Sequence, residues 1–170
     1  SWIMWALFLF LGMLAVADIF GVNPSRSFWS NYERMEGFVT HLHLALLFLV
    51  MAGTFTQERF WTWWFHTSIG ASVLMSLYAV FQLAGALAIN QGGVRVDGTF
   101  GNAIYLAIYL VFHLFFVAYY FFEARGTLWR WIYVPVFFLE LAILLATATR
   151  GAVFAFFISL FLLALGLLAF

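Results

Sequence analysis

The stretch VRVDGTFGNAIYLAIYL, from Val94 to Leu110, places a charged, glycine-broken turn directly before a long apolar run. Glycine ahead of a helix leaves backbone N–H groups accessible, and Asn102 is a residue type that caps helix N-termini well. The apolar run that follows has the composition of a membrane-spanning helix. The stretch therefore predicts a polar loop that ends where a transmembrane helix begins, near Ala103.

The whole chain has the composition of an integral membrane protein. Of its 170 residues, 66% are hydrophobic and 8% are charged, and the mean hydropathy is +1.05. A soluble domain is roughly half apolar and about a quarter charged, so this much apolar surface needs lipid as its solvent. The chain has no basic patch suited to nucleic acid, and the lack of cysteine excludes disulfides and thiol catalysis.

About six apolar segments have roughly the twenty residues that a helix needs to cross a bilayer. They run from Trp2 to Phe20, Phe38 to Phe55, Trp61 to Ala88, Ala103 to Phe122, Trp131 to Thr149 and Ala152 to Phe170. The expected fold is therefore an all-α integral membrane protein in which residues 1–170 form a single membrane domain. Because both ends of the chain lie inside apolar runs, we interpret it as a piece of a longer polytopic protein.

Loops between successive spans alternate between the two faces of the membrane, which divides the arginines into two groups. One face is predicted to carry Arg26, Arg34, Arg95 and Arg150, and the other Arg59, Arg125 and Arg130. The positive-inside rule does not choose between groups of such similar size. The presence of arginines on both faces suggests that one of the two groups binds a ligand.

Arg95 and Arg150 are the arginines with the strongest case for ligand binding. Arg150 interrupts an apolar run without an acidic neighbour, and a charge at the membrane edge usually faces a cavity or a partner. Arg95 precedes Gly101 and Asn102, and a glycine turn at a helix start suits a phosphate group. The alternatives are a hairpin tip whose arginine reaches the surface and an ordinary capped glycine turn.

Histidines and acidic residues offer weaker signals. His41 and His43 are two residues apart and point to different helix faces, so no shared metal site is expected. His113 and Glu140 lie within predicted spans, where ionisable groups mark either proton paths or polar contacts between helices. The sequence leaves open whether His113 bonds to Glu140 or to a backbone carbonyl.

Three stretches resemble motifs of the O-antigen ligase and polymerase superfamily. RVDGTFGNAIYLAIYL, from Arg95 to Leu110, is similar to a signature of that family, and TATRGA, from Thr147 to Ala152, is similar to a second motif. SFWSNYERMEGFVTHLHL, residues 27–44, resembles a loop common in bacterial members. The three motifs occur in the expected order.

The resemblance implies a larger polytopic bundle of the glycosyltransferase-C type in the bacterial inner membrane, with its active face in the periplasm. Such enzymes transfer a glycan from undecaprenyl pyrophosphate to an acceptor, which is a growing glycan, lipid A core or a protein side chain. No metal or other cofactor is implied. Matching the motifs assigns pyrophosphate binding to Arg95, Arg150 and Arg34, with Gly101 and Asn102 beside them.

The family's general base is a histidine in a large periplasmic loop, further along than this chain reaches. The chain's own histidines, His41, His43, His66 and His113, do not match it. Two other classes of function remain open from the sequence. One is a transporter or flippase segment in which His113 and Glu140 relay protons, and the other is a structural membrane bundle.

Overall fold

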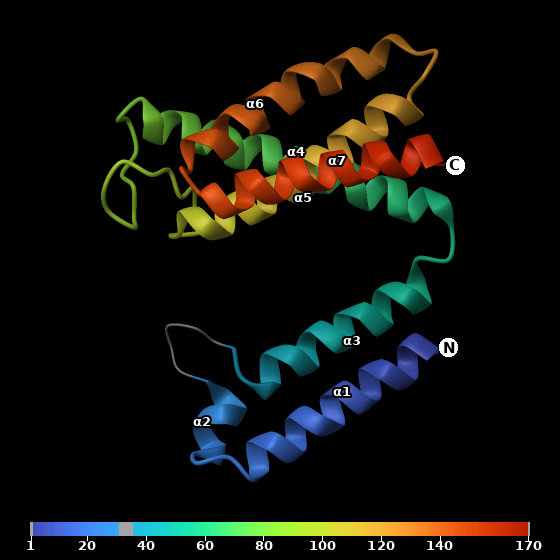
Figure 1. The fold of residues 1–170 in the computed structure, drawn as a ribbon, viewed down its shortest axis with the longest axis vertical. Helices are drawn as coiled ribbons and strands as arrows, with labels where there is room; N and C mark the ends of the chain where they lie inside the picture. Colours follow the sequence, from blue (N-terminus) through green and yellow to red (C-terminus); the bar gives the residue numbers. More distant parts are fainter. Residues whose placement is uncertain (1, 31–35, 170) are drawn as a thin grey trace. The chain divides into compact units, whose positions relative to one another are not determined.

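The computed structural model describes residues 2–30 and 36–169, and the regular structure in those ranges is helical (Figure 1). This confirms the predicted all-α fold. The contacts within the chain form two compact units, residues 1–61 and residues 62–170. The single membrane domain inferred from the sequence stays a prediction.

The first unit contains α1 (Trp2–Ile19), α2 (Pro24–Trp29) and α3 (Phe38–Thr54), which contact one another. None of the residues of α1 is buried, and Trp2 is 90% exposed. A helix this apolar and this exposed is suited to contact with lipid.

The short helix α2 lies in a segment that the sequence analysis read as a loop. Its start has an ordinary cap, because the Asn23 side chain accepts a hydrogen bond from the backbone N–H of Arg26 at 3.3 Å. Pro24 occupies the first turn, where its missing N–H costs nothing. The pair Asn23 and Pro24 is therefore the local sequence feature that indicates the start of this helix.

The second unit contains most of α4 (Glu58–Leu83), followed by α5 (Ala103–Glu123), a 3₁₀ turn η1 (Leu128–Ile132), α6 (Tyr133–Ala146) and α7 (Arg150–Ala169). α5 is central and packs against both α6 and α7. Its buried face carries Leu106, Leu110 and Leu114 at helical spacing. α5 and α7 start at the same end of this unit, beside the loop that follows α4 (Figure 1).

Four helical segments of the described chain are long and apolar enough to cross a membrane: Trp2–Ile19, Glu58–Leu83, Ala103–Glu123 and Leu128–Ala146. The other two predicted spans coincide with shorter apolar helices, Phe38–Thr54 and Arg150–Gly166. The protein is thus an α-helical membrane protein by composition and helix length.

Two of the predicted spans extend at least three residues beyond the ends of their helices. The third span was expected to reach Ala88, but α4 ends at Leu83, because Gly85 has a positive φ of 74° that a continuing helix does not allow. The fifth was expected to reach Thr149, but α6 ends at Ala146, because Ala148 adopts a φ of 51°.

A cysteine-accessibility experiment tests whether α5 crosses the membrane. The chain has no cysteine, so Val94→Cys and Leu128→Cys each introduce a single thiol at a position that is 88% or 86% exposed. We expect a membrane-impermeant maleimide to label the two thiols from opposite sides of sealed vesicles, because α5 lies between them. Labelling of both from the same side would contradict a membrane-spanning α5.

Candidate functional site

The side chain of Gln82 fixes the loop between α4 and α5. Gln82 is buried near the end of α4, and its amide oxygen accepts hydrogen bonds from the backbone N–H groups of Gly98 at 2.9 Å and Asp97 at 3.3 Å. Its amide nitrogen donates to Asp97 Oδ1 at 2.7 Å and to the carbonyl oxygen of Ala88 at 2.8 Å. One buried amide therefore holds the loop at two points along its length.

Asp97 is a fully buried carboxylate whose partners are amides. Besides the bond from Gln82, its Oδ2 accepts a hydrogen bond from the backbone N–H of Gln91 at 2.7 Å. Within the described residues no arginine forms an ion pair with it. The carboxylate thus stabilises the loop and leaves the positive charge of Arg95 uncompensated by a direct contact.

The backbone before α5 has the features that the sequence predicted. Gly98 and Gly101 have φ values of 58° and 67°, which favour glycine, and a Cβ at Gly98 would also lie 3.0 Å from Met75 Sδ. The side chain of Asn102 accepts a hydrogen bond from the backbone N–H of Ile104 at 2.8 Å. The predicted helix cap at Asn102 is confirmed.

The first N–H groups of α5 are already in use. That of Ile104 is capped by Asn102, and that of Ala103 donates to Gln91 Oε1 at 2.9 Å. What α5 offers an anion is therefore the positive end of its dipole rather than these N–H groups.

Arg95 joins the two motifs that lie far apart in the sequence. Its Nε donates to the carbonyl oxygen of Thr147 at 2.8 Å, and its Nη2 donates to Thr149 Oγ1 at 2.8 Å. Thr149 Oγ1 in turn lies 3.5 Å from the carbonyl oxygen of Ala103. The loop before α5, the turn before α7 and the start of α5 therefore meet at Arg95.

Arg95 keeps donors for a further partner. A guanidinium has five N–H donors, and the two bonds to Thr147 and Thr149 use two of them. Because those bonds fix the direction of the side chain, the remaining N–H groups are held in place before a ligand arrives.

Arg150 is the first residue of α7 and is exposed. Across residues 2–30 and 36–169, its side chain has no hydrogen bond or ion pair, and the backbone N–H groups of Arg150, Gly151 and Ala152 have no acceptor. A Cβ at Gly151 would meet nothing within 4 Å, so the space beside this helix start is open. Free N–H groups, a helix dipole and an arginine together favour an anion.

An apolar groove runs along the same two helices. It has a volume of about 540 Å³ and is lined by Ile108, Val111, Phe112 and Phe115 of α5 and by Ala152, Ala155, Ser159 and Leu163 of α7. Ala152 follows Arg150 by two residues, so the groove starts in the first turn of α7. The cationic end of α7 and the apolar groove are therefore adjacent parts of one surface.

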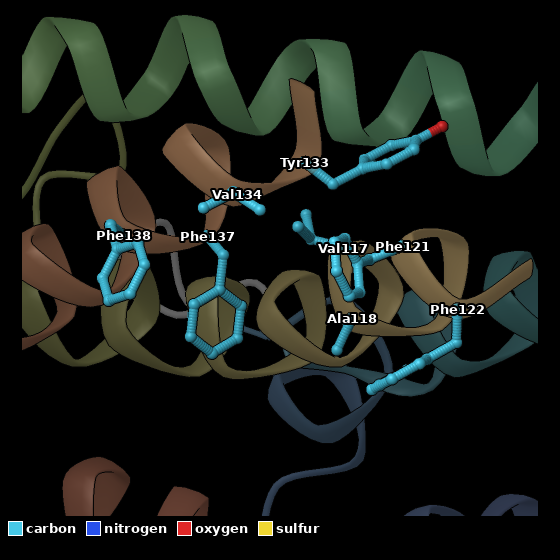
Figure 2. Close-up of a pocket in the computed structure, with 8 residues that line it drawn as sticks. All are labelled: Val117, Ala118, Phe121, Phe122, Tyr133, Val134, Phe137 and Phe138. Carbon is cyan, nitrogen blue, oxygen red and sulfur yellow. The ribbon is translucent and has the colours of Figure 1, made fainter. Parts of the chain in front are cut away.

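A second apolar pocket lies toward the other end of α5. It has a volume of about 220 Å³ and is formed by residues of α5 and α6 that include Val117, Phe121 and Phe137 (Figure 2). The hydroxyl group of Tyr133 points away from it in Figure 2 and lies 2.8 Å from His66 Nε2. With no charged residue in its lining, this pocket has none of the features of a phosphate site.

His113 and Glu140 are both buried, and they do not bond to each other. His113 Nδ1 lies 2.8 Å from the carbonyl oxygen of Tyr109, and its Nε2 lies 2.8 Å from Ser68 Oγ. Glu140 instead contacts the hydroxyl group of Ser72. Of the two partners left open for His113 by the sequence, the backbone carbonyl is the one observed.

The remaining candidates belong to the first unit or fall outside the described residues. Arg34 falls in the segment 31–35, which the structure does not describe. His41 and His43 each contact the carbonyl oxygen one turn earlier, of Gly37 and Val39. Across the described residues, no group of three or more His, Cys, Asp or Glu is placed to hold a metal ion.

Sequence reasoning missed the residues that assemble the site. Gln82 and Gln91 lie in no motif, and Asp97 belongs to the stretch from Arg95 to Leu110 without a role assigned to it. The sequence does not show that side chains from the end of α4, the loop after it and the start of α5 bond to one another. Thr147 and Thr149 were visible as part of TATRGA, but their role as the anchor of Arg95 appears only in the structure.

Comparisons with protein-family models, with curated proteins and with solved structures find no match to this chain. The geometry of the site is therefore the only basis for assigning it a function.

Removal of the Gln82 amide tests the importance of the loop anchor. We expect Gln82→Ala to lower the free energy of unfolding in detergent by about 1–3 kcal/mol, because it leaves buried polar groups of Asp97 and Gly98 without partners. Gln57→Ala, at an exposed position, is the matched control and should change little. Equal stability of the two variants would show that Gln82 does not hold the loop.

Proposed function

We propose that this chain is part of a bacterial inner-membrane glycosyltransferase of the O-antigen ligase or polymerase type. In this proposal it binds undecaprenyl pyrophosphate carrying a glycan, and the glycan is transferred on the periplasmic face to another glycan, to lipid A core or to a protein. The observation that carries the proposal is the bonding of Arg95 to the turn that presents Arg150, beside the start of an apolar groove.

The cationic end of α7 suits a pyrophosphate group. Arg150 and the unused donors of Arg95 supply two guanidinium groups, which pair with phosphate oxygens in a fixed geometry. The free N–H groups at the start of α7 add donors, and the aligned dipoles of α5 and α7 add partial positive charge. Departure of the glycan leaves pyrophosphate with additional negative charge, which such a cationic surface stabilises in the transition state.

The groove between α5 and α7 suits the lipid part of the same donor. An isoprenoid chain is apolar and flexible, and it needs an apolar surface that begins where its pyrophosphate is held. The small side chains of Ala152, Ala155 and Ser159 make room for it along α7. A site for a soluble nucleotide sugar would not need an apolar groove of this kind.

The proposal extends to the architecture. In it, α3 and α7 also cross the membrane, which gives six spans within a larger glycosyltransferase-C bundle. An α3 of 17 residues is about 25 Å long, close to the thickness of the hydrocarbon core. The general base that activates the acceptor is expected in a periplasmic loop beyond these residues, so the proposed role of this chain is donor binding.

Arginine variants test the pyrophosphate site. We expect Arg150→Ala to weaken binding of undecaprenyl pyrophosphate about 10- to 100-fold, which corresponds to the loss of hydrogen bonds to a charged group. Its thermal unfolding should stay unchanged, because the Arg150 side chain has no bond to any described residue. Arg95→Ala should lower both affinity and stability, because it also releases Thr147 and Thr149.

The matched control for these variants is Arg125→Ala. Arg125 lies just beyond the other end of α5, where its guanidinium carbon is 5.3 Å from the centre of the Phe122 ring. Its removal should leave affinity unchanged. Wild-type affinity in both Arg95→Ala and Arg150→Ala, measured by titration in detergent, would refute the pyrophosphate site.

A groove-filling variant tests the placement of the lipid chain. We expect Ala155→Phe to weaken binding of undecaprenyl pyrophosphate but not of inorganic pyrophosphate, because it blocks the groove and leaves the cationic end intact. Ile158→Phe places the same side chain at an exposed position of α7 outside the groove lining and serves as the control. Equal loss of affinity for both ligands in Ala155→Phe would contradict this assignment.

A further inference from the structure

Glu140 is a fully buried acidic residue in a helix long and apolar enough to span the membrane. Its Oε1 contacts Ser72 Oγ of α4, and its Oε2 is buried without a hydrogen-bond partner within the described residues. An ionised carboxylate in such surroundings is costly unless it is paired. The position of Glu140 therefore raises the question of which protonation state fits its contacts.

The contacts of Ser72 distinguish the two states. Besides Glu140, the Ser72 hydroxyl group lies 2.7 Å from the carbonyl oxygen of Ile69. A hydroxyl group has one proton to donate, and a carbonyl oxygen only accepts. Beside an ionised Glu140, Ser72 would face two acceptors with a single proton. Beside a protonated Glu140, the carboxyl group donates to Ser72 and Ser72 donates to Ile69, so both contacts are hydrogen bonds.

Among the residues that the structure describes, no positively charged side chain forms an ion pair with Glu140. On α5, Tyr109 interacts electrostatically with Glu140, and the ring nitrogens of His113 contact Tyr109 and Ser68. On α4, Arg59 lies in the first turn, and the ring nitrogens of His66 contact Thr62 and Tyr133. The other arginines of the neighbouring elements lie at the ends of their elements. Arg150 starts α7, and Arg130 in η1 lies over the rings of Phe121 and Trp131.

Ser76 extends the polar face of α4 beyond Ser72. It lies one helical turn further toward Gln82 and is fully buried, and its hydroxyl group also has no partner within the described residues. Two neighbouring turns of α4 thus present hydroxyl groups in the interior of the unit that contains Glu140. Such a row of hydroxyl groups is suited to hydrogen bonding with a neutral acid.

We propose that Glu140 is a proton-binding site within the membrane-spanning part of residues 62–170. The carboxyl group binds one proton from solution, donates it in the hydrogen bond to Ser72, and is neutral in the folded protein at neutral pH. The ligand of this site is the proton itself. The proposal does not rest on pyrophosphate binding and holds for any function of the cationic end of α7.

Labelling with dicyclohexylcarbodiimide tests the proposal on the full chain in liposomes. This apolar reagent adds to a protonated carboxyl group, and the adduct rearranges to a stable N-acylurea that retains the whole reagent. We expect mass spectrometry to find the adduct on Glu140 at neutral pH, with less adduct in alkaline buffer. Asp97 is a matched internal control that should stay unlabelled, because Gln82 and Gln91 donate to its carboxylate.

Glu140→Gln separates protonation from folding. The amide matches the neutral acid in size and can donate to Ser72, so we expect unchanged thermal unfolding together with complete loss of the adduct at residue 140. The infrared band of a protonated carboxylic acid should be present in the wild-type chain and missing in this variant. Arg150→Ala should label like the wild type, which keeps this test independent of pyrophosphate binding.

Three results would overturn the proposal. The first is a folded wild-type chain in which Glu140 stays unlabelled at neutral pH and shows no carboxylic-acid band. The second is protection of Glu140 by sodium ions at constant pH, which would indicate a cation site instead. The third is a strong loss of stability in Glu140→Gln, because an ionised Glu140 with a charged partner would not tolerate a neutral amide.

Discussion

The two hydrogen bonds from Arg95 to Thr147 and Thr149 hold the functional end of the second unit together. They join a loop, a turn and, through Thr149 and Ala103, the starts of two helices. Bonds from a charged donor are stronger than those between neutral groups, and a partly buried position raises their contribution. Without them, the turn that presents Arg150 would have no side-chain hydrogen bond to the loop before α5.

The buried face of α4 illustrates how helices associate when lipid is the solvent. In water, a helix buries its apolar stripe, but lipid removes most of that driving force and leaves packing and hydrogen bonds. Of the five buried residues of α4, Ser72, Ser76 and Gln82 are polar, and only Ile69 and Ala79 are apolar. The outward faces of the helices are apolar, as the exposed Leu74 and Phe81 show.

The fold was largely predictable because its signals are local. Apolar length marks the helices, and Asn102 caps α5 at the position expected from its side chain. The errors fall at helix ends, where the backbone conformation of a single residue decides where the helix stops. Gly85 and Ala148 adopt positive φ values that end α4 and α6 earlier than apolar composition suggests. The short helix α2 was missed because polar segments between spans were treated uniformly as loops.

The sequence by itself determined that the protein is helical and suited to a membrane. It also predicted that Arg95 and Arg150 belong to the same face, because successive spans alternate in direction. Only the tertiary structure decided how they act together. It bonds Arg95 to the turn before Arg150, assigns Gln82 to hold the loop, and leaves the free N–H groups on α7 rather than α5. These outcomes depend on contacts between residues far apart in the chain, which no local pattern encodes.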